Sequence, residues 1–238
     1  MKFREFIKRI FEAGYSRIAK LNTRLFISFL RYKGIQIGRN FIIRSNGPLS
    51  NILIDYSRPS LITIGDNVTI NKNFNLLTHD FVCGVFLHKF HDFLPSSGRV
   101  TIGNNVRFGV DCTVLKGVTI GDNCFIAAGS LVTKDIPANS VAGGVPCKVI
   151  MSIEDYYERR KEECIKEALD YARSIKERFG RRPVISDFWE EFPLFLNGDE
   201  TSSELPIKWQ LKDSYSYYRN HHKATFNGFE DFLRNAGL

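Results

Sequence analysis

The residue in this chain best suited to chemistry is His79, which lies in the run Asn75-Leu76-Leu77-Thr78-His79-Asp80. An imidazole can accept a proton near neutral pH, so a histidine beside a hydroxyl or amine could act as a general base. The alternative is structural, because a lone histidine often caps a turn or fills a corner. Asn75 could donate to a substrate hydroxyl, although asparagine in a turn more often serves the backbone.

Two further histidines, His88 and His91, have the spacing His-x-x-His. A zinc site needs three or four converging ligands, and no histidine occurs between Arg99 and Asp155. We therefore predict no metal site. His88 is instead a candidate for contact with a substrate, the alternative being plain packing within its loop.

The elements that must position His79 follow a period of six. From residue 102 the first position of each hexad is Ile, Val or Phe: Ile102, Phe108, Val114, Ile120, Ile126 and Val132. The same pattern appears earlier, in Ile64-Gly65-Asp66-Asn67-Val68, and more faintly from Ile37. Short strands joined by tight turns produce such a period, because Gly, Asn and Asp tolerate left-handed backbone. The repeat predicts a parallel β-helix whose coils bury one another's apolar residues.

The repeat stops after Leu76 and resumes near Val100, directly after His79. A loop of this length inside a compact repeat is usually functional or disordered. This one is rich in aromatic residues, which argues against disorder because the rings need a surface on which to pack: Phe81, Phe86, Phe90 and Phe93. We predict an ordered excursion over residues 80–99.

The run from Val100 to Ile150 resembles the left-handed β-helix acyltransferases, and it closely resembles the galactoside and maltose O-acetyltransferases. The resemblance covers residues 35–150. It implies three hexads per coil, left-handed turns and a homotrimer, whereas the usual rule for parallel crossovers favours the right hand. It also implies acetyl-CoA as acyl donor, His79 as catalytic base, and an excursion that shapes the acceptor site beside a neighbouring subunit.

The same resemblance assigns the remaining candidate site residues. It places the pantetheine arm and phosphates of coenzyme A along Ala128, Thr133, Lys134 and Lys148, the alternative for both lysines being ordinary solvated surface positions. On the acceptor side it points to Asp55. Three family positions differ here, a serine, a tryptophan and a second terminal arginine, which are replaced by Val110, Arg107 and Met151.

The expected reaction is direct transfer of an acetyl group from acetyl-CoA to a sugar or saccharide hydroxyl, without an acyl-enzyme. Asp80 follows His79 where the galactoside branch has proline. This Thr-His-Asp variant is associated with acetyltransferases of cell-surface polysaccharide biosynthesis. One alternative is N-acetylation of a nucleotide-linked amino sugar. Another is a non-catalytic structural β-helix subunit.

The two ends of the chain lack the period of six. Residues 1–33 carry nine basic residues against Glu5 and Glu12, with apolar residues at helical spacing. They predict an amphipathic helix that either caps the β-helix or contacts an anionic membrane surface. After Ser152, which with Asp155 marks a helix start, a helix should run to about Gly180. Residues 187–189 and 215–232 suggest two further helices.

The predicted fold is therefore an all-β, left-handed parallel β-helix with N-terminal and C-terminal α-helical appendages. Its expected domains are residues 1–33, the catalytic β-helix at 35–150, and a helical extension at 152–238.

Composition limits the remaining function classes. The chain has 238 residues, 43% of them hydrophobic and 25% charged, as in an ordinary globular protein. Its net charge of +7 resides in residues 1–33, and no nucleic-acid-binding motif occurs, so we expect no nucleic-acid partner. Five cysteines without a CxxC pair, and no recognisable signal peptide, favour a cytoplasmic protein, with membrane association on the cytoplasmic face as an added option.

Overall fold

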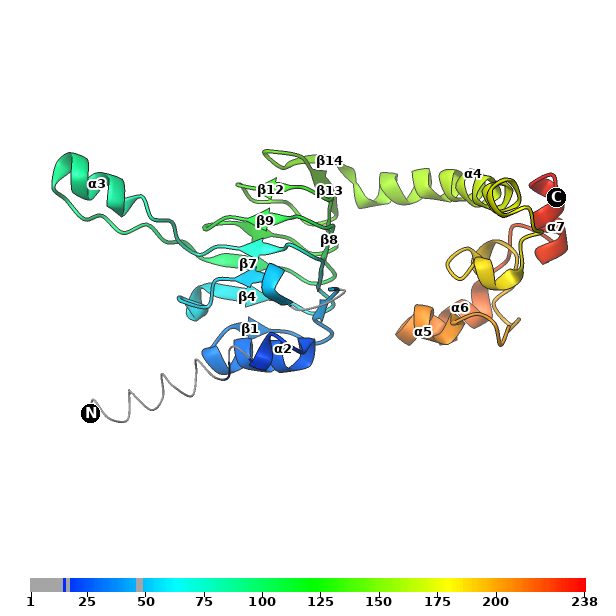
Figure 1. Cartoon of the computed structure of the whole chain (residues 1–238), viewed down its shortest axis with the longest axis horizontal. Helices are drawn as coiled ribbons and strands as arrows, with labels where there is room; N and C mark the ends of the chain where they lie inside the picture. Colours follow the sequence, from blue (N-terminus) through cyan, green and yellow to red (C-terminus); the bar gives the residue numbers. More distant parts are fainter. Residues whose placement is uncertain (1–14, 16–17, 46–48) are drawn as a thin grey trace. The chain divides into compact units, whose positions relative to one another are not determined.

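The computed structural model describes residues 15, 18–45 and 49–238 of the protein (Figure 1). The chain divides between Tyr156 and Tyr157 into two compact units. The first contains the hexad repeats and the second is helical. The helical unit has its own apolar core. Helices therefore make up a larger part of the chain than the predicted all-β class with α-helical appendages implies. The predicted bounds of the three domains stay a prediction.

The hexads form a parallel β-helix of three sheets. The first sheet contains β1 (Gln36–Ile37), β4 (Ile62–Ile64), β7 (Val100–Ile102) and β10 (Thr119–Ile120). The second contains β2 (Ile42–Ile43), β5 (Thr69–Ile70), β8 (Arg107–Phe108), β11 (Phe125–Ile126), β13 (Ser140–Gly143) and β14 (Lys148–Ser152). The third contains β3 (Leu53–Ile54), β6 (Asn75–Leu76), β9 (Thr113–Val114) and β12 (Leu131–Val132).

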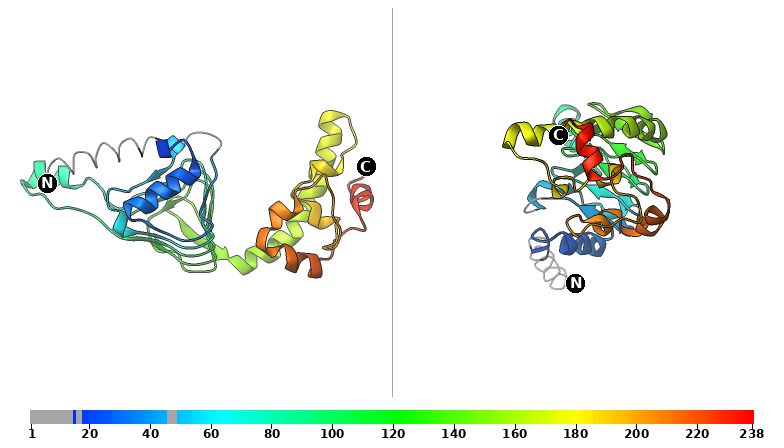
Figure 2. Two further views of the ribbon diagram at one scale, coloured as in Figure 1. Left: turned by 90° about the horizontal axis from the view of Figure 1, so that it is seen from below. Right: turned by 90° about the vertical axis from the view of Figure 1, so that its right-hand side faces the viewer.

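From β1 to β12, successive strands go to successive sheets, so three hexads complete each coil. Seen along its axis the unit has a triangular outline (Figure 2). All strand pairs are parallel except that of β13 with β14, where the chain turns back. The parallel β-helix predicted from the period of six is confirmed, whereas its left hand stays an implication of the family resemblance.

The hexad pattern is a burial pattern. The first-position residues from Ile102 to Val132 are all at most 1% exposed, and fifth-position residues such as Val106 and Cys112 are fully buried beside them. Phe74 and Phe108 meet edge to face in this interior, with ring centroids 4.9 Å apart. All five cysteines are free thiols.

Asparagines make one set of turns between the sheets. Five of them have left-handed backbone with φ between 54° and 59°: Asn40, Asn67, Asn105, Asn123 and Asn139. Their side chains also bond from coil to coil, because the amide of Asn105 donates to Asn123 (3.0 Å) and that of Asn123 donates to Asn139 (2.9 Å). The repeated asparagine therefore both permits the turn and links neighbouring coils.

A helix covers the first coil. α2 (Thr23–Lys33) begins at Asn22, whose side chain accepts from the backbone N–H groups of Arg24 and Leu25, and ends at Gly34 with φ of 106°. Its buried side chains, Phe26, Phe29 and Leu30, belong to the same apolar cluster as the β-helix core. Most of the predicted segment 1–33 before α2 lies outside the described residues, so a membrane contact there stays a prediction.

Three short helices interrupt the coils: η1 (Leu49–Asn51), η2 (Pro59–Leu61) and α3 (Cys83–Phe90). The last lies in the excursion over residues 80–99, which projects from the β-helix (Figure 1). No side chain of α3 is buried. No helix in the described part of the chain is long and apolar enough to cross a membrane.

The second unit is organised around α4 (Ile153–Phe179), which starts where Ser152 and Asp155 bond to each other and is followed by Gly180. The remaining elements are η3 (Ile185–Asp187), η4 (Phe192–Leu194), α5 (Ile207–Leu211), η5 (Lys212–Ser214), α6 (Tyr215–His221) and α7 (Phe229–Asn235). Their common core includes Ala168 and Ala172 of α4 with Phe188, Phe195 and Phe232.

The helix predicted at residues 187–189 is wrong. The chain forms only the 3-10 turn η3 there, because the Asp187 carboxylate bonds the Val184 N–H and Arg181 and so closes the turn locally. Residues 215–232 form two short helices rather than one, because α6 ends before the loop that leads to Gly228 with φ of 88°.

The asparagine turns give a test of the fold. We expect Asn123→Ala to lower the free energy of unfolding by about 2 kcal/mol, because alanine disfavours left-handed backbone and two side-chain bonds are lost. Asn123→Gly, which keeps the backbone but not the bonds, should cost about half as much. Urea unfolding followed by circular dichroism measures both. Equal stability of the two variants would contradict the role assigned to the turn.

Candidate active site

The candidate site lies at one corner of the β-helix, at the carboxyl ends of the strands of the third sheet. The strands are in register, so Ile54, Leu76, Val114 and Val132 stack on one another. The next residues therefore stack as well. Asp55 follows β3, Thr78 and His79 follow β6 closely, and Thr133 and Lys134 follow β12. This register brings four of the residues singled out in the sequence to the same corner: Asp55 and His79 on adjacent coils, and Thr133 and Lys134 two coils beyond His79, with the coil of β9 between them.

His79 and Asp55 are in direct contact. Nδ1 of His79 lies 2.6 Å from Oδ2 of Asp55. The same carboxylate oxygen accepts the backbone N–H of Thr78 at 3.1 Å and the Thr78 hydroxyl. The other oxygen accepts the backbone N–H of Ser57 at 3.2 Å and its hydroxyl at 2.6 Å. Five donors on one carboxylate fix Asp55, and Asp55 in turn fixes the imidazole.

The Asp55 carboxylate is held in its charged form. Burial by itself would raise its pKa, but hydrogen bonds from Ser57, Thr78 and His79 outweigh burial and hold the pKa of Asp55 well below its usual range. A charged acceptor at Nδ1 favours the imidazole tautomer that carries its proton on that nitrogen. The lone pair then resides on Nε2, for which the described residues supply no hydrogen-bonding partner.

His79 is accessible from one side. Its side chain is 19% exposed, whereas that of Asp55 is 10% exposed. The ring of Phe81 lies edge to face against the imidazole, with centroids 5.1 Å apart, and is itself 80% exposed. A shallow pocket of about 200 Å³ opens beside Asp55, lined in part by Lys20, Tyr56 and Ser57.

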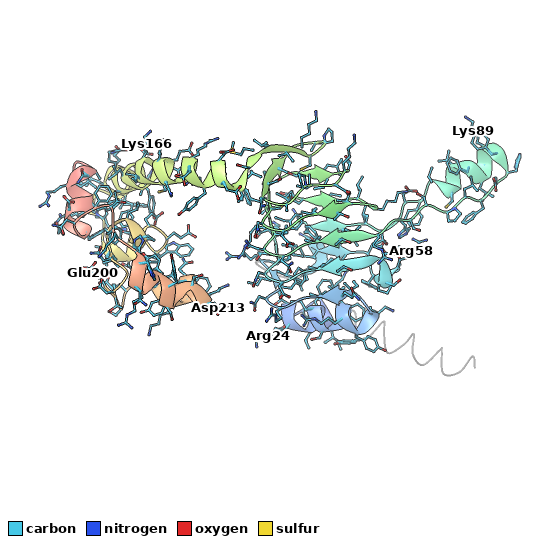
Figure 3. All side chains as sticks on the ribbon, turned by 180° about the vertical axis from the view of Figure 1, so that it is seen from behind. Arg24, Arg58, Lys89, Lys166, Glu200 and Asp213 are labelled. Atoms are coloured by element: carbon cyan, nitrogen blue, oxygen red, sulfur yellow. The ribbon has the colours of Figure 1, made fainter. Side chains whose placement is uncertain are left out.

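The excursion does not bury its rings within one chain. Phe90 and Phe93 are 59% and 62% exposed. The ring of Phe86 is tilted against that of Phe90, with the two centroids 6.1 Å apart. Figure 3 shows Lys89 on the same helix, at the far end of the excursion. His88 lies on this helix too and is exposed, and no contact among the described residues brings it to His79.

The other predicted residues have separate positions. The side-chain amide of Asn75 donates to the backbone of Asn73 (3.1 Å) and to Thr113 (3.3 Å), so its N–H groups are used by the coil. Ala128 lies exposed in the turn after β11, and Lys148 starts β14, both on the second sheet. Among the described residues neither Lys134 nor Lys148 has an ion-pair partner.

Ser57 and Thr78, which hold Asp55, are not among the site residues that the sequence predicts. Counting the register could have found them, because Ile54 and Leu76 occupy equivalent positions on adjacent coils. Across the described residues no group of three or more His, Cys, Asp or Glu side chains could hold a metal ion. His88 and His91 therefore gain no further ligand.

Comparison with known proteins agrees with this architecture. A family model described as the hexapeptide repeat of succinyl-transferase matches residues 99–134. Galactoside O-acetyltransferase of Escherichia coli (strain K12) is 47% identical over 126 residues, 51% of this chain and 55% of that protein. The putative acetyltransferase YvoF of Bacillus subtilis (strain 168) is 31% identical over 152 residues, 63% of this chain and 77% of that protein.

A solved structure, of a galactoside acetyltransferase in complex with coenzyme A, shares 33% identity and covers 65% of this chain and 83% of its own, with a TM-score of 0.47. The sequence matches show that the chain belongs to the hexapeptide-repeat acyltransferase family. It spans only about half the length of the Escherichia coli relative.

The charged state of Asp55 has a measurable consequence. A carboxylate whose pKa is lowered by folding stabilises the protein above its unfolded pKa, near 4, and this contribution is lost as the pH falls below that value. We expect the difference in unfolding free energy between wild type and Asp55→Asn to shrink by about 1 kcal/mol from pH 6 to pH 3. Urea unfolding at each pH measures it. A constant difference would contradict a charged, hydrogen-bonded Asp55.

Proposed function

We propose that the protein is an acetyl-CoA-dependent O-acetyltransferase that acts on a sugar or saccharide hydroxyl, with His79 as general base. The observation that carries the proposal is the 2.6 Å contact between Nδ1 of His79 and a carboxylate held in its charged form. An accessible imidazole oriented in this way presents its basic nitrogen to a substrate.

Asp55 is a positioning residue in this mechanism. It holds the ring of His79 and favours the tautomer with Nδ1 protonated. The family resemblance predicts that Asp55 contacts the acceptor. Both of its oxygens already accept from Ser57, Thr78 and His79, which favours the positioning role. As the imidazole gains a proton during the reaction, the nearby negative charge stabilises it.

The reaction needs one base and no covalent intermediate. The acceptor hydroxyl attacks the thioester carbonyl while Nε2 of His79 takes its proton, and a carbon–oxygen bond forms. The carbon–sulfur bond then breaks, and the proton passes from His79 to the leaving thiolate, which gives the O-acetyl ester and free CoA. Backbone N–H groups of the coil turns could stabilise the negative charge that develops on the carbonyl oxygen.

The acyl donor would lie along the coils that follow His79 in the third sheet, those of β9 and β12. Thr133 and Lys134 follow β12 at the same corner, so a pantetheine arm that runs past them reaches the imidazole. Lys148 and Lys134 are exposed cations suited to the phosphates of CoA, and Ala128 offers backbone without a large side chain. Val110 replaces a family serine and Met151 replaces a family arginine, so the family pattern would lose one hydrogen bond and one phosphate cation at these two positions.

Transfer to oxygen is favoured by the 47% identity with a protein named galactoside O-acetyltransferase. We propose a saccharide acceptor in cell-surface polysaccharide synthesis, on the basis of the Thr-His-Asp variant around His79. The five free cysteines agree with a reducing cytoplasm, where we place the protein.

We further propose a homotrimer. The excursion gathers several exposed apolar side chains on one segment, among them Leu87, Phe90 and Phe93, and such a concentration often marks an interaction site, which supports this assembly. A neighbouring subunit would then cover the excursion and complete the acceptor side of the site.

The function is tested by thiol release from acetyl-CoA in the presence of sugars with hydroxyl groups only and of amino sugars. We expect His79→Ala to lower kcat by 10²–10⁴-fold with unchanged binding of CoA, because only the proton transfer is lost. His221→Ala, an exposed histidine of the helical unit, is the matched control and should keep full activity.

Three outcomes would overturn parts of the proposal. If His79→Ala keeps full turnover, His79 is not the general base. Acetylation of amino sugars alone makes the protein an N-acetyltransferase. If the wild-type protein binds no CoA, it is a non-catalytic β-helix subunit.

A further inference from the structure

The excursion leaves and re-enters the β-helix through a narrow neck formed by residues 78–80 and 96–98. The backbone N–H of Gly98 donates to Thr78 (2.9 Å), and that of Asp80 donates to Ser96 (3.3 Å). Between these bonds His79 and Ser97 pair as an antiparallel bridge. The backbone of His79 therefore sits in a short two-stranded ladder whose second strand is the returning end of the excursion.

One side chain ties this neck together. Oδ1 of Asp80 accepts the backbone N–H of Val82 at 3.1 Å, on the outgoing strand. Oδ2 accepts the hydroxyl of Ser96 at 3.0 Å, on the returning strand, and forms an ion pair with Lys116. Asp80 thus links both strands of the neck to a third segment of the chain.

That third segment belongs to the next coil. Lys116 lies two residues beyond Val114, as Thr78 lies two residues beyond Leu76, and Leu76 and Val114 are paired. The returning strand is pressed against the same turn, because a Cβ added to Gly98 would lie 2.7 Å from the backbone nitrogen of Gly117. The Lys116 side chain is 30% exposed and so partly shielded from solvent.

The rest of the excursion contributes little to holding the neck. α3 buries no side chain, so its packing cannot fix where the excursion begins and ends. His79 stands at the start of this excursion and has two anchors. Asp55 orients its ring, and the neck holds its backbone.

We propose that Asp80 and Lys116 form a clamp that closes the neck and so keeps the imidazole of His79 in its productive place. Both are positioning residues for the proposed acetyl transfer, and the inference rests on that function. Asp80 acts through Ser96 and Lys116, and its oxygens are occupied by them and by Val82. It therefore does not serve as an acceptor contact.

Steady-state kinetics of Asp80→Asn, Lys116→Met and the double variant test the clamp. We expect each single variant to lower kcat about 10–100-fold, with KM for acetyl-CoA within about twofold of wild type, since a displaced base slows chemistry without removing donor contacts. The double variant should be no slower than the slower single variant, because the two residues act as one unit.

Two variants serve as controls. Lys72→Met removes an exposed lysine from another coil turn, and Asp199→Asn removes an exposed carboxylate from the helical unit; both should behave as wild type. Wild-type kcat in Lys116→Met would overturn the clamp. So would an increase in acceptor KM confined to Asp80→Asn, because that result would make Asp80 a substrate contact.

Amide hydrogen exchange tests the clamp without any substrate. Lys116→Met should speed exchange at the Asp80 and Gly98 amides about tenfold relative to Lys72→Met, since both amides bond across the neck. Unchanged exchange would overturn the clamp even in an active enzyme. If the wild type transfers no acetyl group, the proposed function fails, while exchange still decides whether the clamp exists.

Discussion

The hydrogen bond between His79 and Asp55 is the interaction on which the proposed chemistry of this protein depends. It joins two residues that are 24 positions apart and lie on adjacent coils, so it exists only because β3 and β6 are paired in one register. A slip of one residue would turn Asp55 into the interior or away from the ring. The strand register of the β-helix therefore sets the distance between the Asp55 carboxylate and the His79 imidazole.

The rigidity of the β-helix comes from its buried apolar residues and from its asparagine turns. Each coil buries an apolar residue at fixed positions, and asparagine turns bond coil to coil at the corners. Glycines such as Gly109 allow neighbouring backbones to approach, because a Cβ there would lie 2.5 Å from the nitrogen of Ala128. A scaffold with so little freedom can hold one base and one thioester in fixed relation, which is the main requirement of direct acyl transfer.

Much of this architecture can be predicted from the sequence, because buried apolar residues and turn-forming residues recur together every six residues. Ile102 to Val132 predicted the strands, and the gap after Leu76 predicted the excursion. The Asp55–His79 contact was not predicted, since the longer segment around Tyr56 obscures the register between the first coils. In the sequence Asp80 differs from the family pattern only by replacing proline, and its bond to Lys116 depends on which coil turn the returning strand meets. The helix expected at residues 187–189 failed because the Asp187 side chain closes a local turn, which outweighs the apolar spacing.

The central claim is that Asp55 holds His79 as the Nδ1-protonated tautomer, with Nε2 free to accept a proton. The ¹⁵N chemical shifts of the His79 ring, assigned by comparison with His79→Ala and measured above the midpoint of its titration, report this directly. We predict a protonated Nδ1 and an unprotonated Nε2 in the wild-type protein, and we expect that preference to be lost in Asp55→Asn. A proton found on Nε2 in the wild-type protein would contradict it.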